Sequence, residues 1–440
     1  MIDLDQLHVR LSQDELGILQ GVQGATMQKV METVVRYAEA LQAERLVDIN
    51  GPGHLVIPWC IAGIAPPVEM LEELVAAGVK TKYPFTLDPR SPLDFENLDL
   101  DPKIEDAILE LLSGQEHYDT LMLRLGLRDR DAYSCYPYLP EVSNIPKKGM
   151  ILAWSESACA IYANSVLGAR TNRNGAIIDL LQNIVGKTPL AGLLTDEGRR
   201  ADWLIEIETQ RLPNPQLLGS AIGLKVLSGV PYLIGLDRFL STEMDEITTD
   251  YLQEMGAMLA TYSAVSLYHA EKITPEAIEQ GRGLLPDNYK TYVINDSTLE
   301  RLVRSFPILW ADPHAKPEKC YIGCPHLSLR QIYWWADQIE KGLASQRRDH
   351  LAVDTLMCAA PQVIEIFQAN QAAYQRILMA GVKFSSTCCE TVFETGLYTG
   401  RPVITNSNKL RAYTSARYFP DEELVRVIVN GEIPGVRQSG

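Results

Sequence analysis

Short apolar strands alternate with helices along almost the whole chain, and this alternation most constrains its fold. Strands are predicted at residues 46–49, 150–154, 203–208, 231–236, 265–268, 292–294, 320–322, 382–384 and 403–404. Helices are predicted between them, beginning with residues 12–41, 67–77 and 104–112. Such alternation with short connections is typical of α/β proteins, so we expect largely parallel sheets.

The length of the chain predicts several domains, because 440 residues exceed what one hydrophobic core usually serves. No flexible linker or internal repeat marks a boundary, and we place the domains at residues 1–130, 131–310 and 311–440. Three helix starts carry a capping box, in which a serine and the Glu or Gln three residues later exchange hydrogen bonds. They are Ser12 with Glu15, Ser297 with Glu300, and Ser328 with Gln331.

The charge of the chain disfavours nucleic acid and anionic membranes as partners. The sequence holds 56 acidic and 40 basic residues, for a formal net charge of −16. A small anionic substrate stays compatible with this charge, because a local arginine cluster can override the global field. The acidic start MIDLDQ does not resemble a secretory signal, and the apolar stretch 217–236 is interrupted by Lys225 and Pro231. Eight cysteines without a disulfide-type spacing indicate a reducing compartment, so we expect a cytoplasmic protein.

The segment from Trp154 to Arg173, WSESACAIYANSVLGARTNR, places polar side chains at both ends of an apolar helix. These side chains are Glu156, Asn164, Ser165, Arg170 and Arg173. Polar groups where a helix meets a loop often contact ligands, and guanidinium groups suit carboxylates. The alternatives are an ordinary amphipathic helix with a polar rim, or arginines that form structural ion pairs with Glu156 or a neighbouring acid.

Reactive side chains also follow three predicted strands, where ligands of parallel sheets are usually bound. These loops are 323–326 with Cys324 and His326, 385–389 with Cys388 and Cys389, and 405–409 with Thr405 and Lys409. A fourth candidate is Cys135 in the irregular segment SCYPYLP.

Cysteines in distant loops suit an iron–sulfur cluster in which one iron lacks a protein ligand. Cys135, Cys324 and Cys388 are such a set, and an open iron binds a substrate hydroxyl as a Lewis acid. Each cysteine taken alone is more often a small buried hydrophobe. A zinc site made by Cys320, Cys324 and His326 is a further alternative, although the sequence contains no HExxH motif.

Four motifs together resemble the large subunit of the aconitase X family. They are WSESACAIYANSVLGARTNR, IGCPHLS, STCC and ITNSNKLRAYT, and the resemblance runs from about Ser12 to Tyr413. This family belongs to the aconitase superfamily and dehydrates small hydroxylated substrates. The resemblance therefore implies a hydro-lyase with a multi-domain, aconitase-like α/β/α architecture and an iron–sulfur cluster.

The resemblance also implies roles for individual residues. The cluster ligands are Cys135, Cys324 and Cys388, and the catalytic groups are Glu156, Ser165 and Lys409. By its chemistry alone, His326 is a further catalytic candidate. The substrate contacts are His54, Asn164, Arg170, Arg173, Thr405, Asn406 and Ser407. The chain departs from the family at Gly53 before His54, at Cys159, at Ser386, and at the additional thiols Cys320 and Cys389.

Members of the family act on cis-3-hydroxy-L-proline or on mevalonate 5-phosphate. We expect the first type of substrate, because no GxxxxGK phosphate-binding motif occurs here, and keep phosphomevalonate as the alternative. A cluster-free, non-catalytic homologue is the third reading. The family carries its serine base on a small swivelling domain, and the residues after Tyr413 are too few for a domain. We therefore expect a separate small subunit as partner, docked over an exposed cleft that holds the three thiols.

Overall fold

The computed structural model describes residues 7–56, 65–91, 94, 97, 102–388 and 400–433. Its two larger sheets are entirely parallel, and helices cover them, which confirms the predicted α/β class. The predicted domain boundaries at residues 130 and 310 stay predictions. Cys60 and Cys389 lie outside the described residues.

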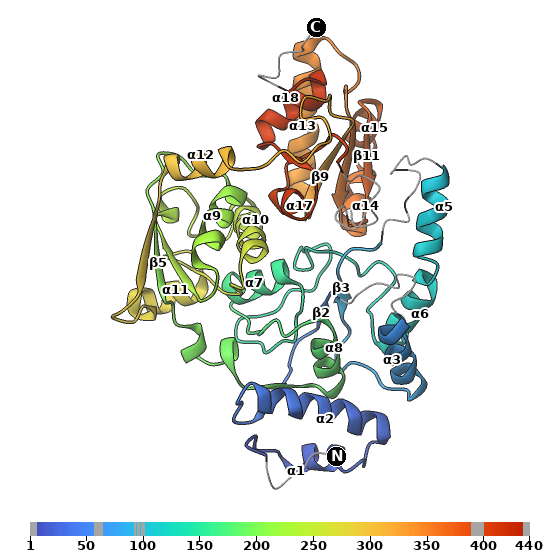
Figure 1. Ribbon diagram of the computed structural model, residues 1–440, viewed down its shortest axis with the longest axis vertical. Coiled ribbons are helices and arrows are strands. Elements are labelled where there is room, and N and C mark those ends of the chain that lie inside the picture. The colour runs from blue at the N-terminus through green and yellow to red at the C-terminus, as the bar shows by residue number, and fades with distance from the viewer. Residues whose placement is uncertain are drawn as a thin grey trace.

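Helices and two short sheets make up the N-terminal part (Figure 1). The strands are β1 (Leu46–Asp48), β2 (His54–Leu55), β3 (Thr86–Leu87) and β4 (Lys187–Pro189). Strand β1 pairs antiparallel with β4, and β2 pairs parallel with β3. The helices are α1 (Gln13–Leu19), α2 (Ala25–Ala40), α3 (Ala65–Ala76), α5 (Pro102–Leu111), α6 (Gln115–Leu125), α7 (Ser157–Ser165) and α8 (Ala176–Val185).

A four-stranded parallel sheet with the order β7-β6-β5-β8 forms the central part. Its strands are β5 (Trp203–Ile207), β6 (Pro231–Ile234), β7 (His269–Ala270) and β8 (Lys290–Ile294). The helices are α9 (Pro215–Val226), α10 (Glu246–Tyr262), α11 (Pro275–Gln280) and α12 (Asp296–Arg304), with short 3-10 turns at η2 (Gly192–Leu194), η3 (Glu197–Arg199), η4 (Leu236–Arg238) and η5 (Gly281–Leu284).

The C-terminal part is a five-stranded parallel sheet with the order β11-β10-β9-β12-β13. Its strands are β9 (Lys319–Leu327), β10 (Asp354–Ala359), β11 (Val382–Ser385), β12 (Val403–Thr405) and β13 (Arg417–Tyr418). The helices are α13 (Leu329–Gln346), α14 (Pro361–Ala369), α15 (Gln371–Met379), α17 (Asn408–Tyr413) and α18 (Asp421–Asn430). Because β9, β11 and β12 are parallel, their carboxyl ends meet at one edge of the sheet.

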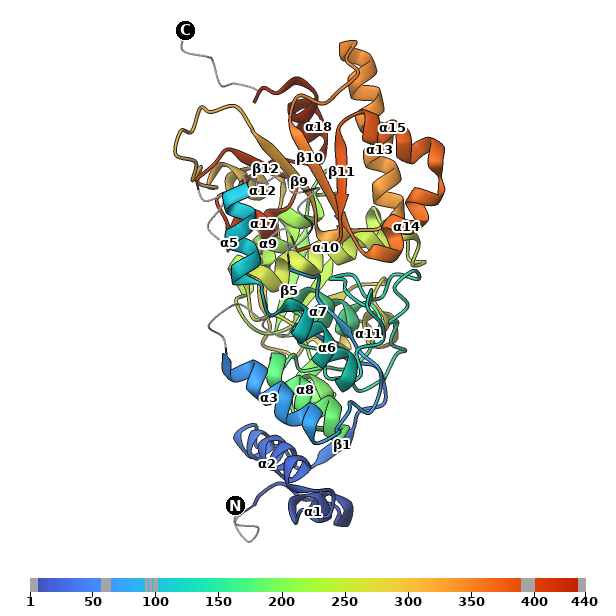
Figure 2. The ribbon, with the colours of Figure 1, turned by 90° about the vertical axis from the view of Figure 1, so that its right-hand side faces the viewer.

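The three parts meet around α7, whose apolar length is fully buried. Both views place α7 in the middle of the molecule, below α10 and α17 and above α8 (Figures 1 and 2). One hydrophobic core joins residues from Tyr136 to Ile433, and a second joins residues from Val9 to Ile184. Polar groups at the start of α7 are therefore far from bulk solvent.

Several predicted elements differ in the structure. The predicted helix at residues 12–41 is two helices, because Gly21 and Gly24 adopt φ values of 86° and 92° between them. Residues 150–154 form isolated bridges and no strand, and β7 begins after the predicted 265–268.

Two predictions about helix starts and loops are also corrected. Asn295, and not Ser297, caps α12, because its side chain accepts a hydrogen bond from the N–H of Thr298. The predicted loop 323–326 is part of β9, although its register with β10 shifts there. The capping boxes of Ser12 and Ser328 are confirmed.

Candidate active site

A buried polar centre forms where β2, the end of β3, α7 and α17 meet. Lys409 Nζ lies 3.5 Å from Glu156 Oε1, and His54 Nε2 lies 3.8 Å from Asp88 Oδ1. The side chains of Lys409 and Glu156 are 13% and 7% exposed. Charges separated from water interact strongly, so the Lys409 and Glu156 charges influence each other and their neighbours.

Glu156 is held as a carboxylate. It is the N-cap of α7, and its Oε1 accepts hydrogen bonds from the Ala158 N–H at 3.1 Å and the Ser157 hydroxyl at 3.2 Å. Burial raises the pKa of Glu156, but Lys409, the Ala158 N–H and His54 more than offset this and hold the pKa well below its usual range. The helix N-terminus adds to the same effect.

His54 faces this centre as a neutral ring. Burial lowers its pKa to about 4, against an opposing contribution from Glu156. Its Nδ1 lies 2.8 Å from the Thr86 hydroxyl, whereas Nε2 makes no hydrogen bond to the described residues. A buried ring nitrogen without a partner indicates a place for a ligand atom.

Arg173 brings a second cation to the centre. Its Nη1 is buried and makes no hydrogen bond within the described part of the chain. Burial lowers its pKa, which the charges of Glu156 and Tyr413 partly restore. Arg173 also has a φ of 54°, an unusual conformation for a residue with a side chain. A buried, unpaired guanidinium Nη1 in a strained turn is suited to an anionic ligand.

Two of the three predicted cluster cysteines, Cys135 and Cys324, lie beside this centre. The N–H of His326 donates to the Cys135 sulfur at 3.1 Å, and Cys135 and Cys324 are only 8% and 9% exposed. Burial raises the pKa of the Cys135 thiol, and the charges of Asp88 and Cys324 raise it further. Cys388 follows the end of β11, where its N–H bonds the carbonyl of Arg90 at 3.0 Å.

These residues fit an iron–sulfur cluster by their chemistry. Cys135 and Cys324 come from separate segments and lie close enough for their charges to interact. Cys388 follows Thr387, whose backbone lies beside His326, so the three cysteines are candidate ligands of one cluster. Both ring nitrogens of His326 are buried without a hydrogen bond of good geometry to the described residues. Burial lowers the pKa of His326 to about 4, with an opposing contribution from the Thr387 backbone. The expected exposed cleft is wrong for Cys135 and Cys324, because both are buried.

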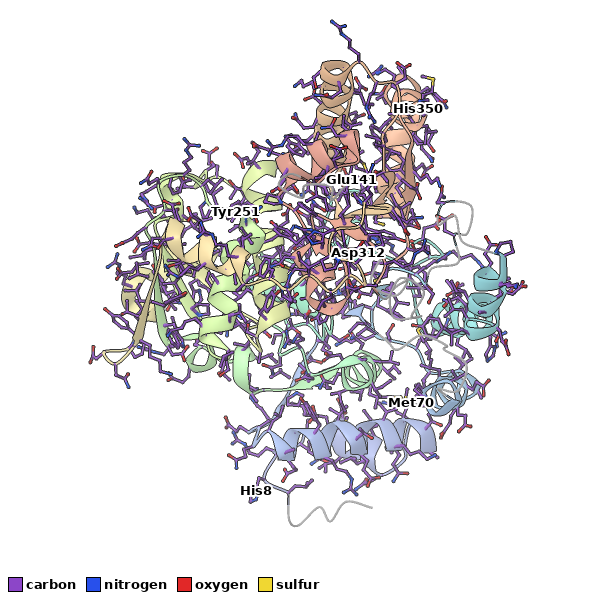
Figure 3. The ribbon with its side chains drawn as sticks, turned by 45° about the horizontal axis from the view of Figure 1, so that its top comes forward. His8, Met70, Glu141, Tyr251, Asp312 and His350 are labelled. Atoms are coloured by element: carbon purple, nitrogen blue, oxygen red, sulfur yellow. The ribbon has the colours of Figure 1, made fainter. Side chains whose placement is uncertain are left out.

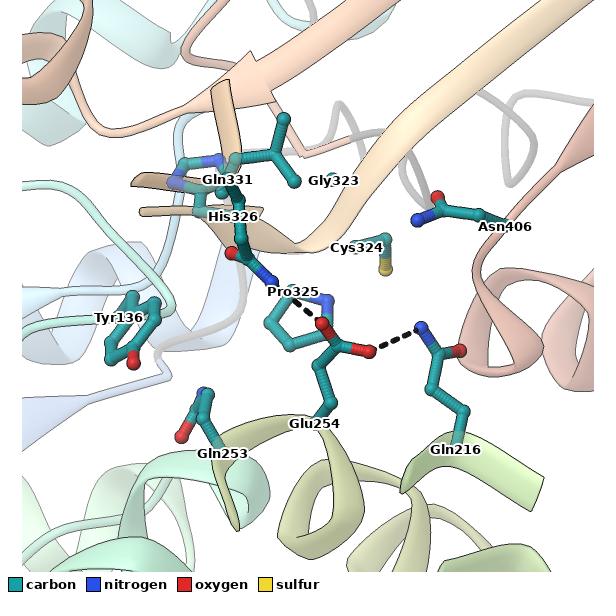
Figure 4. A pocket seen from close by; sticks show the side chains of 11 residues that line it. Tyr136, Gln216, Gln253, Glu254, Gly323, Cys324, Pro325, His326, Gln331 and Asn406 are labelled. Atoms are coloured by element: carbon teal, nitrogen blue, oxygen red, sulfur yellow. Dashed lines mark hydrogen bonds between the residues drawn. The ribbon is translucent and has the colours of Figure 1, made fainter. Parts of the chain in front are cut away.

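Cys324 shares a small pocket with a second buried polar group, Glu254 of α10 (Figure 4). Glu254 accepts hydrogen bonds from Gln331 at 2.6 Å and Gln216 at 3.1 Å. Asn406 lines the same small pocket and donates to Asp421 at 3.0 Å, while its Oδ1 lacks a partner among the described residues. Asn406 is therefore the one residue of the 405–407 loop with an uncommitted side-chain atom.

Thr405 and Ser407 hold the loop in place. The Thr405 hydroxyl accepts from the Ser407 N–H at 2.9 Å, and both residues are fully buried. The Ser407 hydroxyl donates to the Cys324 carbonyl at 2.5 Å and accepts from the Leu410 N–H, which caps α17. These bonds tie Lys409 and Cys324 to one rigid turn.

Three predicted site residues are engaged elsewhere. Arg170 pairs with Asp196 at 2.5 Å, as the structural alternative predicted. Asn164 bonds Thr171, Ser266 and the buried Arg199, and the Ser165 hydroxyl accepts from the N–H of Tyr268. The charge of Glu156 therefore acts on Arg173, whereas Arg170 is engaged by Asp196.

Sequence reasoning missed Asp88, Thr86 and Asn144. Asp88 follows β3 directly, so the rule that ligands lie beyond strand ends would have found it. The other histidines lie away from the centre. His8 and His350 are at opposite ends of the molecule (Figure 3), His117 pairs with Glu72, and His269 bonds the Arg199 carbonyl.

A cavity of about 540 Å³ lies between residues 136–141 and the helices α10 and α13. Its lining includes Tyr136, Tyr138, Asp250 and Arg330. Tyr136 also lines the small pocket that contains Cys324 and His326. The ring of Tyr138 stacks on Tyr162 of α7 with centroids 3.9 Å apart. Through Tyr136, this cavity borders the small pocket that contains Cys324 and His326.

Within the described residues, no helix combines the length and apolar character required to cross a bilayer.

Two protein-family models match the sequence. The family described as the aconitase X first domain matches residues 8–197, and the family described as the aconitase X second domain matches residues 201–304.

Characterised proteins match over most of the chain. The phosphomevalonate dehydratase large subunit of Thermococcus kodakarensis is 32% identical over 73% of this chain and 75% of its own length. The corresponding protein of Methanocaldococcus jannaschii is 28% identical over 92% of this chain and 94% of its own length. The cis-3-hydroxy-L-proline dehydratase of Pseudomonas aeruginosa is 28% identical over 92% of this chain but 66% of its own length.

A solved structure agrees with these relatives. The holo-form of Thermococcus kodakaraensis aconitase X superposes with a TM-score of 0.77 at 27% identity, over 95% of this chain and 99% of that one. The two domain models together cover more than half of the sequence. The chain belongs to the aconitase X family of dehydratases.

Proposed function

We propose that the chain is the large subunit of an iron–sulfur dehydratase that acts on a small hydroxylated carboxylate of the cis-3-hydroxy-L-proline type. The observation that carries this proposal is the centre formed by Glu156, Lys409, His54 and Arg173 beside the buried thiols. Cys135, Cys324 and Cys388 would hold the cluster, which when bound supplies a Lewis acid for the departing hydroxyl.

The charges of the centre favour a substrate of low net charge. Lys409 and Arg173 are its cations, and Glu156 and Asp88 are its carboxylates. A zwitterionic amino acid would meet a complementary group at each end: its carboxylate at Arg173 and its ammonium at a carboxylate. The internal segments outside the described residues contain no Lys, Arg or His, so the chain adds no further cation from them.

The described residues bind and orient the substrate more readily than they deprotonate it. Dehydration removes a proton from carbon and expels the neighbouring hydroxyl group, so it needs a base. Glu156 is committed to Lys409 and the start of α7, and burial keeps His54 and His326 neutral. We infer that the base comes from a small partner subunit with a serine. The archaeal relatives are named as large subunits, which supports such a partner.

Phosphomevalonate is the second candidate substrate. Relatives named for it match up to 95% of their own length, whereas the two hydroxyproline relatives match over about two thirds of theirs. This substrate carries a phosphate and a carboxylate. Its binding would therefore need cations from the partner subunit in addition to Arg173 and Lys409.

The test is an anaerobic assay of water loss from both substrates, with the chain alone and with its small subunit. The proposal predicts turnover of cis-3-hydroxy-L-proline only when both subunits are present. Turnover of phosphomevalonate alone would favour the second candidate, and inactivity of the iron-loaded pair on both would refute the proposal. Full activity without the partner would locate the base in this chain, with His326 the first residue to test.

A further inference from the structure

His54 can face the centre in two chemically opposite ways. Its Nε2 either carries a proton and donates, or carries a lone pair and accepts or binds a metal. The second reading has support from spacing, because ligand atoms of His54, Asp88 and Cys159 all lie within 4.8 Å of one another. The hydrogen bonds on the other side of the ring distinguish the two.

The orientation of Asn144 is fixed by a carbonyl group. One amide atom of Asn144 lies 3.0 Å from the Gly53 carbonyl oxygen and 2.8 Å from the Thr86 hydroxyl. A carbonyl oxygen only accepts, so the atom facing it must be the NH₂ group. Asn144 therefore donates to the Thr86 hydroxyl as well.

The Thr86 hydroxyl then has one direction left for its own proton. Its hydrogen-bond partners among the described residues are the Asn144 amide, which donates to it, and His54 Nδ1 at 2.8 Å. Thr86 is buried, so water does not take the hydroxyl proton instead. If Nδ1 carried the proton, the hydroxyl hydrogen would lose its partner inside the protein, which costs about 1–3 kcal/mol. Nδ1 is therefore the acceptor.

We propose that Asn144 and Thr86 are positioning residues that fix His54 as the neutral tautomer with its proton on Nε2, so that His54 meets the substrate as a hydrogen-bond donor. The ring then points an N–H towards Asp88 and the Glu156 side of the centre. Nε2 has no lone pair for a metal in this tautomer, and the His54, Asp88 and Cys159 group is not a metal site. The hydrogen bond from Nε2–H to a substrate oxygen rests on the proposed function, whereas the assignment of the tautomer does not.

The loop before His54 is built for the same contact. The Gly53 carbonyl accepts both the Asn144 amide and the Thr86 N–H at 3.1 Å. A Cβ at Gly53 would lie 2.9 Å from the Asn183 amide, closer than such atoms approach. Asn183 itself bonds the carbonyls of Ala153 and Asp179, so it has little room to move. Glycine at position 53 therefore keeps the loop close to Asn183 and holds its carbonyl on Asn144.

The direct test is the tautomer itself, read from long-range ¹H–¹⁵N correlations of the full chain labelled with ¹⁵N-histidine. We expect a protonated Nε2 and an unprotonated Nδ1 for His54, assigned by its absence in H54Q. T86V removes the hydroxyl at nearly constant volume and should convert the signal to the other tautomer or to a mixture. T86S should restore it. A protonated Nδ1 in the unsubstituted protein would overturn the inference.

Activity and metal binding give independent readings. With the small subunit present, we expect T86V to lower kcat/KM about 10- to 100-fold with unchanged iron content, and T86S to rescue it. Cobalt(II) titration of the full chain should give the same thiolate absorption with and without H54Q. A band lost in H54Q would show that Nε2 binds metal and would contradict the inference. The correct tautomer in a pair that turns over neither substrate would refute the proposed function alone.

Discussion

Removing the charge of Lys409 should destabilise the protein in a manner that depends on pH. The Lys409 and Glu156 charges are 3.5 Å apart and nearly buried, so at an effective dielectric constant of about 20 their attraction is about 5 kcal/mol. Breaking such a pair typically costs about 3–5 kcal/mol, because one charge stays buried alone. We expect K409M to lower the melting temperature at pH 7 by several degrees.

The sign of the pH dependence follows from the lowered pKa of Glu156. A carboxyl group whose pKa falls on folding stabilises the protein above the ordinary value of 4.5, and this stability is lost as the pH falls below it. Without Lys409 the pKa of Glu156 rises, so the folded protein takes up a proton more readily than the unfolded chain. The stability difference between K409M and the unsubstituted protein should therefore shrink from pH 7 to pH 5.

The assay is thermal unfolding of the full chain at both pH values, with iron content measured in each sample. K409R keeps the charge and should lose much less stability. K272M removes a lysine from an exposed pair with Asp237 and should change stability by less than about 1 kcal/mol. An equal loss for K409M at pH 7 and pH 5 would refute the reasoning.

Two further predictions separate binding groups from structural ones. R173K should lower kcat/KM about 10- to 150-fold, because one charge-assisted contact with the substrate is lost. R170K should change kcat/KM by no more than a few-fold, because the Arg170 guanidinium pairs with Asp196. Equal losses of kcat/KM in the two variants would contradict this assignment. R199M removes the partner that lies 2.7 Å from the buried Glu276 carboxylate, and should lower the free energy of unfolding in urea by about 3–5 kcal/mol. A decrease below about 1 kcal/mol would show that the pair is dispensable for stability.

The sheets and the strand-end loops could be predicted because their signals are local. Alternating apolar strands and helices predict parallel sheets, and parallel strands bring their carboxyl ends together wherever the chain returns. The segments that follow β11 and β12 are therefore recognisable from the sequence as candidate sites, whereas residues 323–326, predicted as a loop, are part of β9. The same reasoning placed the Ser328 capping box correctly.

The roles of individual polar residues could not be predicted, because they depend on contacts between distant segments. The sequence does not distinguish the roles of Arg170 and Arg173, which lie three positions apart. In the structure Arg170 pairs with Asp196, whereas the charge of Glu156 acts on Arg173. Asn164 has an amide that could bind a ligand, but Arg199, 35 positions away, donates a hydrogen bond to its side-chain oxygen. The burial of a side chain also depends on distant segments, so the sequence did not predict that Cys135 and Cys324 are buried.

The central claim is that three cysteines from separate segments hold an iron–sulfur cluster. The most direct measurement is iron and acid-labile sulfide per chain, with absorbance near 400 nm, in anaerobically purified protein. We predict a coloured protein whose iron is lost in C135S, C324S and C388S and retained in C320A and C358A, with similar thermal unfolding of all variants after iron removal. Iron and colour retained in C324S, or a colourless iron-free unsubstituted protein after anaerobic reconstitution, would contradict the account.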